Sequence, residues 1–207
     1  MSTESYIIDG ARSPIGLKNG KMVGVRSDDL TAMVIKGLMR RNPNIPSNSI
    51  EDVVVGCAFP EGPQGMLVAR AISILSELPV ETGGKVVNRF CGSSMDSVHQ
   101  LSQAIVAGDI DAGIAAGVED MFGVPMGGFN PSFHPELYEK ELYIGMGDTA
   151  EILANDLDIS RDDQEEFSIK SHEKALAAIE GGRFQNEIIP IDINGTIVDK
   201  DEGPRTP

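Results

Sequence analysis

Apolar and polar positions follow two rhythms through the first 118 residues. Short, nearly continuous apolar runs predict buried strands, and longer stretches with apolar residues at every third or fourth position predict helices. The predicted strands are residues 6–8, 53–56, 85–88 and 112–118. The predicted helices are residues 30–41, with an N-cap at Asp28 and Asp29, then 65–78 and 93–107. Because strands alternate with helices, the pattern predicts an α/β domain with a mostly parallel sheet.

The pattern changes after Glu119. Residues 123–143 are rich in Gly, Pro, Phe and Met and predict a long irregular segment, which in a compact protein is usually functional. The elements expected beyond it are a short helix at 149–157, a long helix at 161–180 capped by Ser160, and a hairpin of 188–193 and 196–199 around Asn194-Gly195. We therefore predict two domains, an α/β domain at 1–118 and a loop domain at 119–207.

Composition and charge exclude several classes of protein. The 207 residues are 41% hydrophobic and 24% charged, as in ordinary globular proteins, and no apolar run reaches the roughly 18 residues that a membrane span needs. The first residues lack a secretory signal pattern, which predicts a cytoplasmic protein. The net charge of −15 lies entirely in residues 101–207. Such acidity disfavours a nucleic-acid partner, and we interpret it as a solvated acidic surface.

The cysteines and histidines form no metal-binding pattern. Cys57 and Cys91 lie far apart and are expected to be reduced thiols, and the three histidines, His99, His134 and His172, are scattered along the chain. The sequence therefore predicts no metal site. Cys57 directly follows the predicted strand at 53–56, and we expect it to be a small residue of the core. If this strand and the strand at 85–88 end at the same edge of the sheet, Cys57 could instead lie near Cys91.

Cys91 is the strongest candidate for a chemical role. It lies between the strand at 85–88 and the helix at 93–107, and Gly92 beside it permits a close or unusual backbone path. The free N–H groups and the positive dipole end of a helix N-terminus favour a thiolate and can stabilise an oxyanion. A nucleophile is one interpretation, and an inert core cysteine is the other, because most free cysteines are buried.

Several segments match, in order, the motifs of a known family. The segment Asn-Arg-Phe-Cys-Gly-Ser-Ser-Met at 88–95 and the segment Met-Gly-Asp-Thr-Ala-Glu at 146–151 are the most distinctive. The other matching segments are residues 11–16, 116–121, 160–171, 182–184, 187–190 and 201–205. Together they resemble the thiolases, and most closely the degradative 3-ketoacyl-CoA thiolases of fatty-acid β-oxidation. The resemblance covers essentially the whole chain.

The resemblance implies a fold, a reaction and three site residues. The fold would be the N-terminal half of a thiolase-like layered fold, with helices on both faces of the sheet and a loop domain. Cys91 would attack the 3-keto carbon of a 3-ketoacyl-CoA and carry the acyl group as a thioester, with its backbone N–H as half of an oxyanion hole. Met146 would line the acyl and pantetheine tunnel, and Arg205 would hold the adenine end of coenzyme A. Coenzyme A is a substrate in this family, which uses no metal and no bound cofactor.

The chain departs from the family in one respect. The family's base, acid and enolate-stabilising groups come from a Gly-His-Pro histidine, an Asn-Glu-Ala asparagine and a second cysteine near Gly-rich sequence, and none of these motifs occurs in the sequence. His99 does not replace them, because it lies eight residues beyond Cys91, about 12 Å along a helix. Turnover is therefore expected to require a complementing C-terminal half.

The resemblance also implies partners, and two other functions stay open. The expected assembly is a homodimer or tetramer, and a hydratase/dehydrogenase subunit accompanies some β-oxidation thiolases. Without the second half, one face of the α/β unit should be exposed and apolar, which favours association or poor solubility. The alternatives are a non-catalytic acyl-CoA-binding or assembly protein of this fold, and a biosynthetic, acetoacetyl-CoA-forming thiolase.

Overall fold

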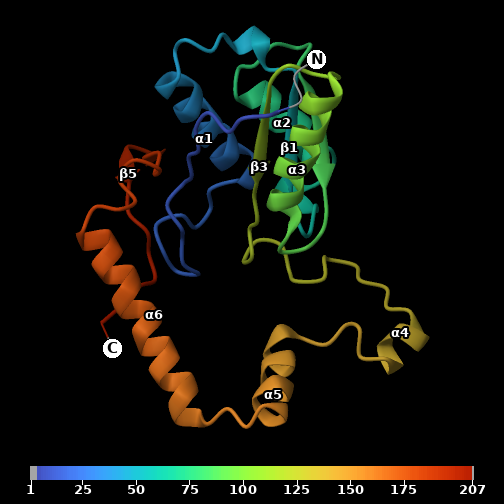
Figure 1. The fold of residues 1–207 in the computed structure, drawn as a ribbon, viewed down its shortest axis with the longest axis vertical. Helices are drawn as coiled ribbons and strands as arrows, with labels where there is room; N and C mark the ends of the chain where they lie inside the picture. Colours follow the sequence, from blue (N-terminus) through green and yellow to red (C-terminus); the bar gives the residue numbers. More distant parts are fainter. Residues whose placement is uncertain (1–3, 207) are drawn as a thin grey trace. The chain divides into compact units, whose positions relative to one another are not determined.

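A computed structural model describes residues 4–206 of the chain, and they form two compact units (Figure 1). The first unit consists of residues 4–129 and Gln185–Gly203, and the second consists of Asn130–Phe184 with residues 204–206. The first unit thus takes in residues on both sides of position 118. The division into an α/β domain and a loop domain at that position stays a prediction.

Three parallel strands form the sheet of the first unit. The strands are β1 (Asp52–Gly56), β2 (Gly83–Val87) and β3 (Gly113–Gly117), and β1 lies between the other two. Gly56 is paired with Val87 on one side and with Gly117 on the other, so all three strands end at the same edge. The predicted α/β class and parallel sheet are confirmed.

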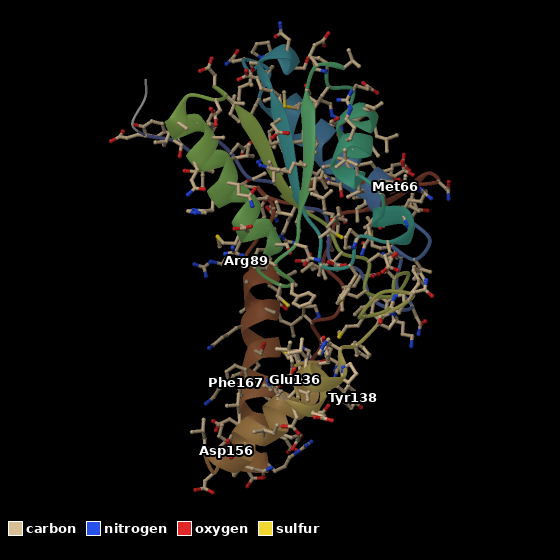
Figure 2. All side chains as sticks on the ribbon, turned by 90° about the vertical axis from the view of Figure 1, so that its right-hand side faces the viewer. Met66, Arg89, Glu136, Tyr138, Asp156 and Phe167 are labelled. Carbon is tan, nitrogen blue, oxygen red and sulfur yellow. The ribbon has the colours of Figure 1, made fainter. Side chains whose placement is uncertain are left out.

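Helices cover both faces of this sheet. They are α1 (Ser27–Arg41) and α2 (Val68–Leu75) on one face and α3 (Ser93–Ala107) on the other (Figure 2). Because side chains alternate along a strand, Val53 and Val55 pack with α1 and α2, whereas Val54 packs with Leu101 of α3. All three valines are completely buried, so the centre of the core lies along β1.

Two glycines let α3 lie close against the ends of the strands. A Cβ at Gly56 would lie 2.3 Å from the backbone nitrogen of Ser94, and a Cβ at Gly117 would lie 2.4 Å from the Ser94 Cβ. No side chain fits at such distances. The start of α3, and with it the turn that contains Cys91, is therefore held at the carboxyl edge of the sheet.

The segment 185–203 belongs to the first unit because it binds the N-terminal loop. The Arg12 guanidinium donates two hydrogen bonds to Asp201 (2.6 and 2.8 Å) and one to Glu187 (2.6 Å). The backbone N–H of Ile15 also donates to Asp201, whose side chain is only 9% exposed. Two of the segments that carry the family resemblance, 11–16 and 201–205, thus meet through an ion pair.

A small hairpin lies within the same segment. Its antiparallel strands are β4 (Ile191–Ile193) and β5 (Thr196–Val198), and Ile191 and Val198 are buried. Asn194 and Gly195, with φ angles of 52° and 86°, occupy the left-handed region that a two-residue turn of this kind requires. The predicted hairpin is confirmed, with shorter strands than expected.

The second unit contains three helices and no core of its own. The helices are α4 (Pro135–Glu139), α5 (Met146–Asp156) and α6 (Arg161–Glu180). No residue of these helices, all of which the structure describes, is buried. Ser160 caps α6 as predicted, because its hydroxyl accepts the N–H of Asp163 (3.1 Å) and the Asp163 carboxylate accepts the N–H of Ser160 (3.2 Å).

Some local expectations are wrong. The run at residues 6–8 forms no strand, and its three side chains are 72–83% exposed. An apolar run becomes a strand only where a neighbouring strand supplies hydrogen bonds, and none of the strands among residues 4–206 pairs with it. α1 begins at Ser27, and its N-cap is Arg26 without a side-chain bond, rather than Asp28 or Asp29.

The helix α2 (Val68–Leu75) is shorter than the range 65–78 that the apolar pattern predicted. Met66 and Glu77, on either side of α2, have φ angles of 57° and 62°, and a left-handed residue interrupts a right-handed helix. The irregular segment 123–143 contains one short helix, α4. Short 3₁₀ turns at Ser47–Ser49 and Gly62–Gln64 complete the elements of the described residues.

Candidate functional site

Cys91 lies on the exposed turn between β2 and α3, at the edge where all three strands end. Cys57 follows β1 and Glu119 follows β3 at the same edge, because the strands are parallel and in register. The structure therefore brings together three segments that are distant in the sequence. The candidate site is this turn and the groups beneath it.

The turn before Cys91 has a left-handed residue at Phe90 (φ 46°), whereas Gly92 has an ordinary φ of −89°. The expectation that Gly92 supplies the unusual backbone path is therefore wrong. A Cβ at Gly92 would meet the Arg89 carbonyl oxygen at 3.4 Å, which is an ordinary contact. The tight turn arises one residue earlier, where the backbone N–H of Gly92 donates to the Arg89 carbonyl (3.0 Å).

α3 begins directly after Cys91. Gly92 is its N-cap and provides no side-chain bond, so the first N–H groups of the helix are not capped by the residue that precedes it. The helix has 15 residues, and its dipole favours negative charge at this end. This end of the helix is the end at which Cys91 lies. Arg89, labelled in Figure 2 near the start of α3, adds a positive charge. Its Nη1 atom lies 3.6 Å from Oδ1 of Asp96.

Cys57 has the opposite environment. It is 1% exposed, and its backbone N–H donates to the Val87 carbonyl (3.1 Å). Burial, together with the nearby Glu119 carboxylate, raises the pKa of the Cys57 thiol to about 11. This thiol stays protonated near neutral pH, and the interpretation of Cys57 as a small core residue is confirmed.

Glu119 forms a polar network that the sequence did not reveal. Its carboxylate accepts the N–H groups of Ala58 (2.6 Å) and Phe59 (3.3 Å) and the side-chain amide of Gln64 (2.6 Å). Gln64 is completely buried, and its carbonyl oxygen accepts the N–H of Asp120 (2.8 Å). A charged residue directly after a buried strand was the available signal, but its partners lie more than fifty residues earlier in the chain.

The three histidines lie in different places. His99 is exposed on α3, about two turns beyond Cys91. His134 is the N-cap of α4, and His172 lies on α6, where its Nδ1 accepts the backbone N–H of Arg205 (3.3 Å). His134 and His172 belong to the second unit and Cys91 to the first.

Met146 and Arg205 both belong to the second unit. Met146 is the first residue of α5 and is 67% exposed, and Arg205 is exposed beside α6. Their side chains are accessible to a ligand. Their roles in binding coenzyme A stay predictions.

Residues 4–206 contain neither a candidate metal site nor a candidate membrane-spanning helix. No group of three or more His, Cys, Asp and Glu side chains in this range is arranged to hold a metal ion. None of the helices in it combines the length and the apolar character of a membrane span.

Comparison with known proteins shows the family. The family described as "Thiolase, N-terminal domain" matches residues 5–207. The chain is 39% identical over 204 residues to a 3-ketoacyl-CoA thiolase of Bacillus subtilis, which covers 97% of this chain and 52% of that protein. It is 41% identical over 203 residues to a 3-ketoacyl-CoA thiolase of Marinobacter nauticus (95% and 52%) and 43% identical over 189 residues to one of Photobacterium profundum (90% and 49%).

These matches extend along nearly the whole chain and include the turn that carries Cys91. The chain spans about half the length of the curated relatives it matches. The matched segment is thus part of a longer protein in those relatives, and this chain belongs to the thiolase family, matching its N-terminal domain.

Proposed function

We propose that this chain takes part in acyl transfer between a 3-ketoacyl-CoA and coenzyme A, with Cys91 as the nucleophile. The observation that carries the proposal is the placement of Cys91, which is exposed on a tight turn directly before the N-terminus of α3. Membership of the thiolase family, with relatives named 3-ketoacyl-CoA thiolase at about 40% identity, supports the substrate class.

The proposed reaction has two steps. The Cys91 thiolate attacks the C3 carbonyl carbon, the C2–C3 bond breaks, and its electron pair leaves on C2 as the enolate of acetyl-CoA, which takes up a proton. The shortened acyl group stays on Cys91 as a thioester. In the second step the thiolate of free coenzyme A attacks this thioester, and the Cys91 sulfur is released.

The residues of this chain would contribute charge stabilisation and binding. The N–H groups of the first turn of α3 would stabilise the oxyanion of the attacked carbonyl, and preorganised donors of this kind lower the barrier strongly. The backbone N–H of Cys91 would be one such donor. Met146 would line the path of the acyl and pantetheine groups, and Arg205 would bind the adenine end of coenzyme A. No metal or bound cofactor enters this proposal.

A base for the thiol proton and an acid for the enolate are still needed. Cys57 is unsuited to either role because it is buried and its pKa is raised to about 11. We propose that the base, the acid and the enolate-stabilising groups come from a complementing C-terminal thiolase half. A homodimer or tetramer, and a hydratase/dehydrogenase partner, stay predictions, as does a cytoplasmic location.

The test is acylation of Cys91. The chain, alone and with a complementing C-terminal half, is incubated with acetoacetyl-CoA, a short 3-ketoacyl-CoA, and its intact mass is measured. We expect an acetyl adduct that peptide mapping places on Cys91. Cys91→Ser should abolish the adduct, and Cys57→Ser, the matched control, should keep it.

Two results would contradict the proposal. If acetoacetyl-CoA binds but no adduct forms, both with the chain alone and with the complementing half present, the result would favour a non-catalytic acyl-CoA-binding protein. An adduct that survives in Cys91→Ser would place the chemistry on another residue.

A further inference from the structure

The residue that precedes Cys91 is held from both sides. Phe90 adopts a left-handed backbone (φ 46°), which residues with a Cβ avoid unless their surroundings impose it. Its N–H donates to the side-chain oxygen of Asn88 (3.0 Å). Its carbonyl accepts both the N–H (3.0 Å) and the hydroxyl (2.6 Å) of Ser93, which is the first residue of α3. The direction in which Cys91 leaves the turn is therefore set by these two side chains.

Asn88 also joins the turn to the end of β1. Its amide N–H donates to the Ala58 carbonyl (2.8 Å) while its carbonyl oxygen accepts from Phe90, so each end of this one amide is used. The rings of Phe59 and Phe90 are in contact, with centroids 5.8 Å apart, alongside this link. A residue in the segment after β1 is thus connected to the turn through one side chain.

Glu119 fixes the segment that Asn88 binds. Its two carboxylate oxygens accept the N–H groups of Ala58 (2.6 Å) and Phe59 (3.3 Å). The carboxylate cannot swing away easily, because the buried Gln64 donates to it (2.6 Å) and also to the Phe59 carbonyl (2.8 Å). The chain of contacts runs from Glu119 through Ala58 and Asn88 to Phe90, and none of these groups reaches the Cys91 sulfur itself.

We propose that Asn88 is a positioning residue for Cys91, and that Glu119 supports it by fixing the Ala58 backbone. This inference rests on the proposed function. Loss of the Asn88 amide would release Phe90 from its left-handed conformation and let the sulfur move away from the N-terminus of α3. Small displacements of a reacting atom reduce rates strongly, whereas the binding of coenzyme A groups far from the turn is unaffected.

Asn88→Ala removes both hydrogen bonds of the amide. Asn88→Asp keeps an oxygen for the Phe90 N–H but loses the donor to Ala58, so it is the conservative variant. Glu119→Gln keeps the size of the side chain but replaces one carboxylate oxygen with an NH₂ group. This hydrogen-bond donor would face the donors of Ala58, Phe59 and Gln64. Asn44→Ala, at an exposed asparagine in the loop before β1, is the matched control.

Two readouts are measured on each variant of the full chain. The first is the rate of acylation of Cys91 by acetoacetyl-CoA, in the preparation in which the wild type is acylated. For Asn88→Ala we expect the saturating rate to fall on the order of tenfold or more, with the half-saturating concentration within about twofold of the wild type. Asn88→Asp and Glu119→Gln should lie between Asn88→Ala and the wild type, and Asn44→Ala should equal the wild type.

The second readout does not need the proposed reaction. It is the rate at which iodoacetamide alkylates Cys91 in a Cys57→Ala background, which we expect Asn88→Ala to change several-fold. If the wild type is acylated and Asn88→Ala matches Asn44→Ala in both readouts, the positioning role is wrong and the proposed function stands. If the wild type is never acylated, the proposed function fails, and the alkylation rates alone decide whether Asn88 positions Cys91.

Discussion

The two compact units contain helices of comparable length but bury them very differently. In the first unit, Ile72 of α2 and the three valines of β1 are completely buried. In the second unit, no residue of α4, α5 or α6 is buried, and Phe167 and Tyr138, both labelled in Figure 2, are 76% and 65% exposed. Apolar side chains are therefore present in both units, but only the first unit has a sheet against which they pack.

The difference shows two ways in which a helix is specified. α6 has strong local signals: a capping box at Ser160 and ion pairs one turn apart between Arg161 and Glu165 (2.8 Å) and between Lys170 and Glu166 (2.5 Å). α2 has only eight residues and no side-chain cap, so its stability must come from the core. Substitutions that remove packing and substitutions that remove local signals should therefore act on different units.

The largest expected difference is between two isoleucines. Ile72→Ala removes a completely buried side chain and should lower the free energy of unfolding of the first unit by about 2–5 kcal/mol. Ile169→Ala removes a side chain of α6 that is 43% exposed, and it should change the free energy of unfolding by about 0.5 kcal/mol or less. Urea denaturation followed by circular dichroism measures both. Equal effects would contradict the contrast between the units.

Two glycines provide the next comparison. Gly56→Ala forces a methyl group to within 2.3 Å of the backbone of α3 and should cost about 1–3 kcal/mol of stability, as overpacking does. Gly147→Ala in α5 meets nothing within 4 Å and should instead stabilise its helix by up to about 0.5–1 kcal/mol. Thermal denaturation should shift in opposite directions for the two variants. A tolerated Gly56→Ala would show that α3 can move away from β1.

The ion pair between Arg12 and Asp201 should make the first unit sensitive to acid. The hydrogen bonds from Arg12 hold the pKa of the Asp201 carboxyl below its ordinary value. The ion pair therefore stabilises the folded state fully above the unfolded-state pKa of an aspartate, about 3.9. This stabilisation is lost as the pH falls through the lower pKa of Asp201 in the folded state. Asp201→Asn should cost about 1.5 kcal/mol at neutral pH, and this cost should shrink in acid. Urea titrations at a series of pH values measure the difference, and a cost that is independent of pH would argue against the pair.

The smallest expected effect concerns the cap of α6. Ser160→Ala removes the hydroxyl that accepts the Asp163 N–H and should destabilise the start of the helix by about 1 kcal/mol. Hydrogen exchange should therefore speed up in the first turn of α6 and stay unchanged in β1 and α3. Faster exchange throughout the chain would mean that the second unit stabilises the first more than its lack of buried helix residues indicates.

Much of the fold could be predicted from local pattern. The range of α3 follows from apolar spacing, the start of α6 from the Ser160 cap, and the Asn194-Gly195 turn from its two residue types. The apolar run at residues 6–8 was misleading, because a strand depends on a partner that no local pattern reveals. Apolar spacing also extended α2 too far, because it does not report the left-handed residues on either side.

The candidate site likewise has one part that the local sequence predicted and one part that it did not. The position of Cys91 between a strand and a helix could be predicted from about ten consecutive residues. The support beneath it could not, because Ala58, Asn88 and Glu119 come from three segments that meet only when the strands pair in parallel and in register. The burial of Gln64, a polar residue in a 3₁₀ turn, could likewise not be predicted.

The sequence by itself determined the class of fold, the family resemblance, the place of Cys91 at a helix start and the local signals of α6. These features depend on neighbouring residues, whose interactions form wherever the chain folds. Only the tertiary structure decided that Phe90 rather than Gly92 takes the left-handed conformation, that Glu119 lies beside Cys57, and that Arg12 pairs with Asp201. These depend on contacts between distant segments, and the entropy of bringing such segments together is repaid only by the packed sheet and its core.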